Sequence, residues 1–358
     1  MNELAGNILG GYYLEEEIGR GSMGVVYRGK QMALGREVAI KLLPQSHARD
    51  ASYVARFIRE AYIIAGLNHP NIVQIYDAGQ HNKILYFVME YVQGPTLAHL
   101  LQLDGIITPH LAVEYAAQIA EALDAAYSER NVIHRDIKPE NLMLNRWGKI
   151  KVMDFGLARA TGQQKITVAK TLVGSIYYSS PEQIWGYVLD NRSDIYALGV
   201  VLYEMVTGRR PFNGRSMPEL THAITNNPPV LPRTYNPSLP VGLEHIIMTA
   251  LAKDRDQRYA HAGLMAQHLR MLSMQPPPAT QYQPFTPLPP TQLPRNITPV
   301  FDRPTGHQRT SWNGITEVPG WPQPEEEAPS PFQANTQPQK RGSLRSHIRN
   351  WLGRPPRE

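Results

Sequence analysis

The sequence predicts an α+β fold with two lobes, a small β-rich lobe followed by a larger helical lobe, and a disordered proline-rich tail. Short runs of β-branched and aromatic residues occupy the region before residue 92, and helical periodicity dominates from residue 109 to residue 273. Proline then becomes frequent, because 18 of the 31 prolines lie between Pro276 and Pro356. These changes along the chain predict a cleft between two unlike lobes, with an unfolded segment after them.

The β-rich lobe is expected to cover residues 12–91. Its strands are predicted in three runs of β-formers bounded by turn residues, at 24–30, 36–43 and 84–92. One helix is predicted between the strands, at 53–67, because four apolar residues share one of its faces: Val54, Phe57, Ala61 and Ile64.

The helical lobe is expected to cover residues 92–273. Its most regular helical patterns lie at 109–130 and 194–208. Together the two lobes give a folded domain at 12–273, which is long enough to bury a large core.

Composition excludes several classes of protein. The chain has no cysteine, which excludes disulfides, thiolate zinc sites and a cysteine nucleophile. No apolar run approaches the ~20 residues that a membrane-spanning helix needs, and the first residues lack the basic and apolar regions of a signal peptide. We therefore expect a soluble, cytoplasmic protein.

The proline-rich region is predicted to be a disordered linker at 274–339, followed by a separate basic tail at 340–358. The tail carries six lysine and arginine residues and one acid, so its net charge is +5. This is also the net charge of the whole chain. The folded part therefore has no broad basic face, and no nucleic acid is expected as a partner.

Three glycines, Gly19, Gly21 and Gly24, form a Gly-x-Gly-x-x-Gly pattern. The dinucleotide-binding form of this pattern needs a helix directly after the last glycine. Here β-forming residues follow, which favours a hairpin whose bare backbone closes over phosphates. An ordinary hairpin is the alternative.

Three further segments carry polar groups beside apolar runs. Lys41 ends an apolar strand, and Glu60 lies along the apolar stripe of the 53–67 helix, where a buried acid needs a partner such as Lys41. Residues 131–145, NVIHRDIKPENLMLN, place His134, Arg135, Asp136, Lys138 and Asn141 between apolar flanks, as in a site loop on a rigid scaffold. Asp154 follows an apolar strand and precedes a glycine, where it could bind Mg²⁺ or simply form a turn.

These segments, in this order, resemble the protein kinase family and look closest to the bacterial eukaryotic-like (Hanks-type) serine/threonine kinases. The resemblance extends from about Tyr12 to Leu272, with later matches at SSPEQ (179–183) and LAKDRDQRY (251–259). It implies a bilobal protein kinase fold and Mg·ATP-dependent phosphorylation of protein serine and threonine hydroxyls.

By this resemblance, Asp136 would orient the acceptor hydroxyl and Lys138 would neutralise the transferred phosphoryl group. Asn141 and Asp154 would hold Mg²⁺, with Mn²⁺ as an alternative. Lys41, braced by Glu60, would contact the α- and β-phosphates.

The resemblance also implies structural and adenine-binding roles. His134 would pack under Phe155. Ser175, where the family usually has threonine, keeps a hydroxyl that can reach Lys138. The nucleotide would be covered by Gly19, Gly21 and Gly24 and enclosed by Ile18, Val26, Ala39 and Met143. Its adenine edge would meet backbone groups of Glu90 and Val92. Structural roles are implied for an ion pair of Glu182 with Arg258 and for Asp194 as the anchor of the catalytic loop.

Regulation is expected through autophosphorylation of Thr167 or Thr171, with Arg135 as the docking point for the new phosphate. Such a reaction in trans implies a homodimer. The other expected partners are protein substrates with serine or threonine acceptors.

Two competing functions and a role for the tail stay open. A nucleotide-binding pseudokinase would typically lack Lys41, Asp136 or Asp154, and all three are present. An adaptor would act through its proline-rich segment, read by SH3- or WW-like grooves. Residues 340–358 are a solvated tail, a docking segment, or a short amphipathic helix that attaches peripherally to an anionic membrane.

Overall fold

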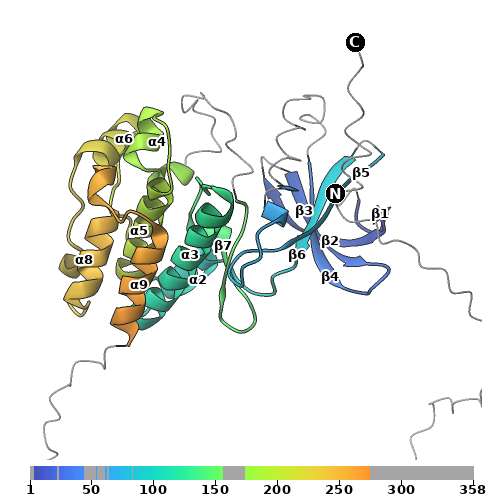
Figure 1. Cartoon of the computed structure of the whole chain (residues 1–358), viewed down its shortest axis with the longest axis horizontal. Coiled ribbons are helices and arrows are strands. Elements are labelled where there is room, and N and C mark those ends of the chain that lie inside the picture. The colour runs from blue at the N-terminus through green and yellow to red at the C-terminus, as the bar shows by residue number, and fades with distance from the viewer. Residues whose placement is uncertain are drawn as a thin grey trace, which may run out of the picture. The chain divides into compact units, whose positions relative to one another are not determined.

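The computed structural model describes residues 4–21, 24–43, 54, 61–62, 64–82, 84–155 and 174–274 (Figure 1). Within these residues a β-rich lobe is followed by a helical lobe, which confirms the predicted α+β architecture. The linker and tail, which we predicted at 274–339 and 340–358, lie outside the described residues from residue 275 onward.

The β-rich lobe is one antiparallel sheet in the order β1-β2-β3-β4-β6-β5. Its strands are β1 (Ile8–Leu9), β2 (Tyr12–Gly21), β3 (Gly24–Gln31), β4 (Glu37–Leu42), β5 (Ile75–His81) and β6 (Ile84–Glu90). Three of them, β3, β4 and β6, match the predicted runs within two residues at each end. Strand β5 was not predicted, because this edge strand has the mixed sequence IYDAGQH, which lacks a run of β-forming residues.

Two hydrophobic clusters form on the sheet. One contains Leu14, Tyr27, Ile40 and Val88, and residues Leu4 and Ala5 at the start of the chain pack against it. The other is the main core, to which β4 and β6 contribute Ala39 and Phe87 together with many residues of the helical lobe. The two lobes therefore share a continuous apolar core.

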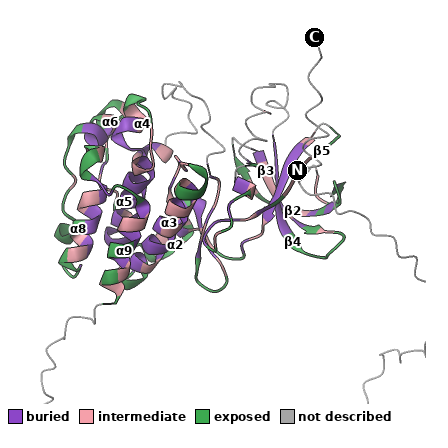
Figure 2. Ribbon diagram, viewed as in Figure 1, coloured by how far each residue is buried: buried purple, intermediate pink, exposed green. Residues whose placement is uncertain are grey.

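The helical lobe has two long central helices, α3 (Pro109–Arg130) and α5 (Arg192–Thr207). Both are lined with buried residues, and α5 is almost completely covered by its neighbours (Figure 2). Around them lie α2 (Leu97–Asp104), α4 (Pro181–Trp185), α6 (Met217–Asn226), α7 (Pro232–Tyr235), α8 (Val241–Ala250) and α9 (Ala262–Ser273). Helix α3 has the predicted bounds, and none of the helices in the described ranges is long and apolar enough to cross a bilayer.

A small hairpin lies near the start of the helical lobe, between the loop that ends at Asn141 and the segment that contains Asp154. It pairs β7 (Leu142–Leu144) with β8 (Ile150–Val152), and Val73 donates from its N–H to Val152 O at 3.0 Å. Another close approach occurs at Gly94, where a Cβ atom would lie 2.0 Å from Leu144 O. Only glycine therefore allows the chain between the lobes to pass this hairpin.

Candidate active site

The loop before β7 is held by a carboxylate from α5. Asp194 accepts hydrogen bonds from the N–H of His134 at 2.6 Å and of Arg135 at 2.7 Å. Arg135 has a φ of +67°, a left-handed conformation that a non-glycine residue adopts only where its surroundings enforce it. Asp194 therefore anchors this loop in a strained conformation, in agreement with the anchoring role implied by the sequence.

His134 is completely buried in this loop. Its ring lies 4.6 Å from that of Phe155, between ring centroids, and its Nε2 lies 2.7 Å from Met153 O. The packing against Phe155 confirms the sequence expectation. A side chain enclosed in this way supports the segment that carries Asp154 and cannot reach an external substrate.

Two polar side chains of the loop converge on the Asp136 carboxylate. Asn141 Nδ2 donates to Asp136 O at 2.7 Å and to Asp136 Oδ2 at 3.2 Å. Lys138 Nζ lies 2.9 Å from the same Oδ2 and donates to Ser175 Oγ at 2.8 Å. Asp136 is thus fixed in orientation but remains partly exposed, as a group that meets a substrate must be.

Lys41 and Asp154 meet from opposite lobes. Lys41 Nζ lies 2.6 Å from Asp154 Oδ1, although the two residues are 113 positions apart in the chain. Burial raises the pKa of Asp154, but the Lys41 charge and hydrogen bond outweigh burial and hold this pKa below its usual value. Asp154 is therefore a carboxylate at neutral pH. The predicted partner of Lys41, Glu60, lies outside the described residues.

The donor set fits a divalent cation that shares its ligands with phosphates. Asn141 uses its Nδ2 on Asp136, its Oδ1 has no hydrogen-bond partner among the described residues and so suits a cation, and Asp154 supplies a carboxylate. The described parts of the chain contain no cluster of three or more His, Cys, Asp or Glu side chains that could hold a metal alone. Mg²⁺ commonly binds through one or two protein oxygens together with phosphate and water oxygens.

The residues predicted to enclose a nucleotide come together at the junction of the lobes. Gly19, Gly21 and Gly24 lie in the β2–β3 hairpin, where Gly21 pairs with Gly24, and Gly24 has a φ of +129°. This arrangement confirms a glycine-rich hairpin in place of a strand–helix turn. The expected adenine-lining residues are buried or partly buried, except for Ile18 at the hairpin edge, and comprise Val26, Ala39 and Met143.

The segment after β6 has backbone groups available for a ligand. Glu90 donates from its N–H to Gln74 O at 2.8 Å. Within the described ranges, by contrast, the N–H and C=O of Val92 make no hydrogen bond to the protein. Because buried backbone groups are almost always paired, these two suit an external partner. Thr167 and Thr171, the expected phosphorylation sites, lie outside the described residues.

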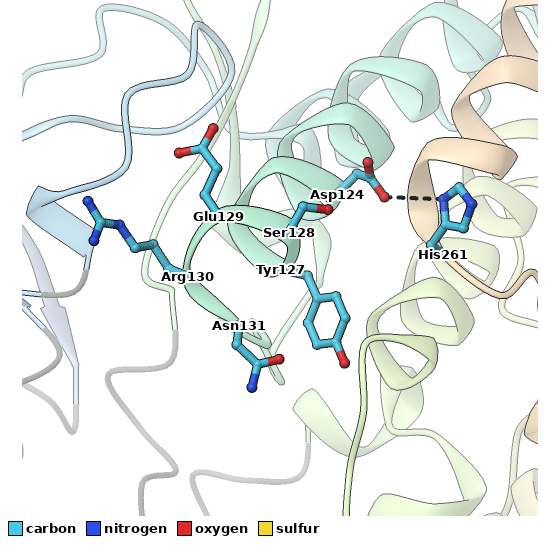
Figure 3. A pocket seen from close by; sticks show the side chains of 7 residues that line it. All are labelled: Asp124, Tyr127, Ser128, Glu129, Arg130, Asn131 and His261. Atoms are coloured by element: carbon cyan, nitrogen blue, oxygen red, sulfur yellow. Dashed lines mark ion pairs between the residues drawn. The ribbon is translucent and has the colours of Figure 1, made fainter.

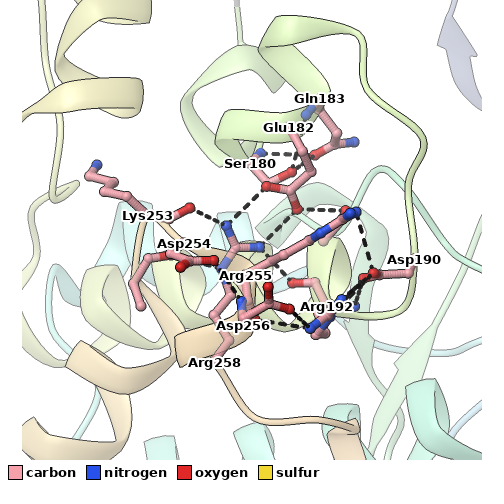
Figure 4. A network of polar contacts seen from close by, with 12 residues as sticks. Ser180, Glu182, Gln183, Asp190, Arg192, Lys253, Asp254, Arg255, Asp256 and Arg258 are labelled. Atoms are coloured by element: carbon pink, nitrogen blue, oxygen red, sulfur yellow. Dashed lines mark hydrogen bonds and ion pairs between the residues drawn. The ribbon is translucent and has the colours of Figure 1, made fainter.

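A polar network below the site is structural. Arg258 binds Glu182 through two hydrogen bonds, from Nη1 to Oε1 at 2.8 Å and from Nη2 to Oε2 at 2.9 Å (Figure 4). Gln183, next to Glu182 on α4, donates from Nε2 to Arg135 O at 2.9 Å. The network thus connects the end of the helical lobe to the loop that carries Asp136, and it confirms the pairing of Glu182 with Arg258.

A separate pocket of about 840 Å³ lies at the C-terminal end of α3 (Figure 3). Two of its charged side chains bind the backbone of other segments: Asp124 Oδ1 accepts a hydrogen bond from Gly263 N–H at 2.8 Å, and Arg130 donates to Gly66 O at 3.2 Å. None of the residues predicted for catalysis or nucleotide binding lines it. We therefore assign it no part in the active site.

Comparison with known proteins identifies relatives of the whole folded region. A protein kinase domain family model matches residues 12–269. The chain is 43% identical over 257 residues to serine/threonine-protein kinase PrkC of Bacillus subtilis. The matched region covers 71% of this chain and 39% of that protein. A probable serine/threonine-protein kinase of Streptomyces coelicolor is 44% identical to this chain over 265 residues. That match covers 72% of this chain and 39% of the relative.

A third relative is serine/threonine-protein kinase PknB of Mycobacterium tuberculosis, which is 40% identical over 275 residues. That match covers 75% of this chain and 44% of the mycobacterial protein. The chain therefore spans about two fifths of the length of the curated relatives that it matches.

Proposed function

Because the chain belongs to the protein kinase family, among the bacterial eukaryotic-like (Hanks-type) serine/threonine kinases, we propose that it transfers the γ-phosphoryl group of ATP to serine and threonine hydroxyls of proteins. One observation carries the proposal most directly. Asp136 is oriented by Asn141 and Lys138, and Lys138 also binds Ser175, so that a carboxylate and an ammonium face the same point.

These residues suffice to assist an in-line transfer. The acceptor hydroxyl oxygen forms a bond to the γ-phosphorus as the bond from that phosphorus to the β–γ bridging oxygen breaks. Asp136 orients the hydroxyl and receives its proton, and Lys138 neutralises charge on the transferred group. The structure suits this role because Asn141 and Lys138 hold the same Asp136 oxygen.

Lys41 and Asp154 have complementary roles on the nucleotide side. A divalent cation, Mg²⁺ or Mn²⁺, would neutralise phosphate charge when it is held by Asn141 and Asp154. Lys41 would donate to the α- and β-phosphates. The ammonium and the carboxylate lie 2.6 Å apart, which places both charged groups together between the lobes.

The test of this function is transfer of labelled phosphate from ATP to a protein acceptor, followed by mapping of the modified residues. We expect the wild-type chain to modify serine or threonine, and Asp136→Asn to lose about 10²–10⁴-fold in rate while it still binds ATP. Asp136→Asn activity above about a tenth of wild type would contradict the role of this carboxylate. Nucleotide binding without transfer by the wild-type chain would favour the pseudokinase alternative.

We further propose that phosphorylation between Asp154 and Glu182, at Thr167 or Thr171, activates the enzyme. A phosphate carries about −1.5 to −2 charge and would form charge-assisted bonds to an arginine such as Arg135. Replacing both threonines by alanine is expected to lower activity, and full activity in that variant would contradict the proposal. Dependence of the autophosphorylation rate on protein concentration tests whether a homodimer carries it out in trans.

The remaining proposals concern the proline-rich linker and the basic tail. We propose a cytoplasmic enzyme that can attach peripherally to an anionic membrane through residues 340–358, whose basic residues each contribute about 1 kcal/mol near such a surface. Salt-sensitive sedimentation with anionic vesicles, lost when residues 340–358 are deleted, is the expected result. Equal binding to neutral vesicles would contradict it. SH3- or WW-type readers of residues 274–339 are tested by binding of a peptide from that linker.

A further inference from the structure

An ion pair joins the two lobes beside the expected adenine site. Lys151 Nζ lies 2.8 Å from Glu90 Oε2 and 3.4 Å from Ile72 O. The exposed fractions of the two charged side chains are only 12% for Lys151 and 24% for Glu90. Lys151 belongs to β8 and Glu90 ends β6, so this contact connects the small hairpin to the chain between the lobes.

Glu90 is held by its backbone as well as by its side chain. Its N–H donates to Gln74 O at 2.8 Å, and its Oε2 also accepts from Gln74 N–H at 3.4 Å. Two residues later, Val92 presents the backbone groups that we assign to the adenine edge. The ion pair therefore acts at the start of the segment that would bind the base.

Lys151 is equally constrained on the other side. It pairs across the hairpin with Met143, and opposite residues of an antiparallel pair place their side chains on the same face. The next residue, Val152, donates from its N–H to Asn71 O at 2.8 Å. Asp154 follows three residues after Lys151. The lysine thus belongs to a hairpin in which one strand, β7, carries the expected adenine-lining residue Met143 and the other, β8, leads to Asp154.

We propose that Lys151 is a positioning residue: through its ion pair with Glu90 it fixes the adenine-binding backbone relative to Met143, and it thereby sets the affinity for nucleotide. The proposal rests on the nucleotide-binding function proposed above. If one partner of a poorly exposed pair is removed, the other charge is left without compensation and its segment shifts toward water. That shift would separate the two surfaces that hold the adenine ring.

A second lysine of the same hairpin provides a matched control. Lys149 Nζ lies 3.2 Å from Glu114 Oε1, but 59% of the Lys149 side chain is exposed. Such an exposed pair is screened by water and contributes little. Lys149→Met therefore removes a lysine–glutamate pair from the same strand region without acting on Glu90.

The experiment measures adenosine binding to the full chain by calorimetry, because adenosine has no phosphate and needs no cation. We expect Lys151→Met and Glu90→Gln each to weaken adenosine and ATP binding about tenfold, and the double variant to lose no more than either single one. The ATP KM is expected to rise in parallel, with kcat changed less than about threefold. Lys149→Met is expected to bind both ligands as wild type does.

Two further variants retain an ion pair at these positions. They test the proposal even if Lys151→Met and Glu90→Gln fold poorly. Lys151→Arg, and the exchanged pair Lys151→Glu with Glu90→Lys, should retain adenosine affinity within about threefold of wild type. The proposal is overturned if folded Lys151→Met binds adenosine normally, if the single effects add in the double variant, or if folded Lys151→Arg binds poorly. Because binding is measured without transfer, a wild type that binds ATP but transfers no phosphate would contradict the proposed function alone.

Discussion

Two buried ion pairs of this protein, Glu182–Arg258 and Lys41–Asp154, differ in how completely their hydrogen-bonding groups are used. Arg258 donates twice to Glu182 and also to three backbone carbonyls, and Glu182 accepts a further bond from Ser193 Oγ at 2.7 Å. The side chains of this pair are 5% exposed for Glu182 and 0% for Arg258. Neither has capacity left for a ligand.

Among the described residues, the Lys41–Asp154 pair has one contact, at 2.6 Å, and the Asp154 side chain is 27% exposed. An ammonium has three donors and a carboxylate can accept several bonds, so this contact by itself does not use the full capacity of either group. The contrast shows how to separate structure from function among buried charges. A fully satisfied, buried pair holds the fold, and a partly exposed pair whose contact leaves hydrogen-bonding capacity is available for chemistry.

The largest expected effect is at the Lys41–Asp154 pair, where a substitution should lower activity much more than stability. Lys41→Met removes a charge that would act on the phosphates, so phosphotransfer should fall at least about a hundredfold. The melting temperature should change by only a few degrees, because the Asp154 carboxylate can still be hydrated at its exposed side. Labelled-phosphate transfer and thermal unfolding measure both quantities. If activity fell only in proportion to the amount of folded protein, Lys41 would have a structural role like that of Arg258, and the difference between the two pairs would be contradicted.

Arg258→Met should have the opposite profile. It leaves Glu182 buried without a partner, and we expect the free energy of unfolding to fall by about 3–5 kcal/mol. Urea unfolding measures the change, and phosphotransfer per folded molecule should be retained at low temperature. Arg255→Met is the control, since Arg255 is 41% exposed and 3.5 Å from Asp190, and it should cost less than about 1 kcal/mol. Similar costs for the two variants would contradict a structural role specific to Arg258.

The pH dependence of stability sharpens the same comparison. Burial raises the pKa of Glu182, but the hydrogen bond and charge of Arg258 outweigh burial and lower it from 4.5. The stabilisation is therefore complete above pH 4.5, where the unfolded carboxyl is ionised, and it is lost as the pH falls through the lower folded pKa. Urea unfolding between pH 7 and pH 3.5 should show a smaller acid-induced loss for Glu182→Gln than for wild type. Identical pH profiles would contradict this assignment.

The smallest expected effect concerns Lys253, a partly buried cation that has no carboxylate partner in the described ranges. Lys253 Nζ lies 2.5 Å from Ile224 O, and burial, followed by the charge of Arg258, lowers its pKa to about 7. The unfolded state binds more protons between pH 7 and pH 10.5, so stability should rise with pH in that window. Lys253→Met should change stability at pH 7 by less than about 1 kcal/mol and abolish this rise. An unchanged rise between pH 7 and pH 9 in the variant would assign it to other groups.

Much of the fold could be predicted because its signals are local. Helix α3 has a continuous apolar pattern, and β4 and β6 are runs of β-forming residues, so their periodicity was sufficient. Strand β5 has no such pattern, because its sequence, IYDAGQH, mixes polar residues and a glycine with only one buried residue, Ile75. Its existence depends on pairing with β6, which only the tertiary arrangement supplies.

The sequence by itself determined the residues of the candidate site, since His134, Asp136, Lys138 and Asn141 lie within eight consecutive positions and their types and spacing are informative. Tertiary structure alone decided how charges meet across the chain: Lys41 with Asp154, and Lys151 with Glu90. Lys151 carried no sequence signal, because a lysine in a short strand is usually solvated. What makes it distinctive is burial beside a carboxylate 61 residues away, and burial is a property of the packed lobes and not of the local sequence.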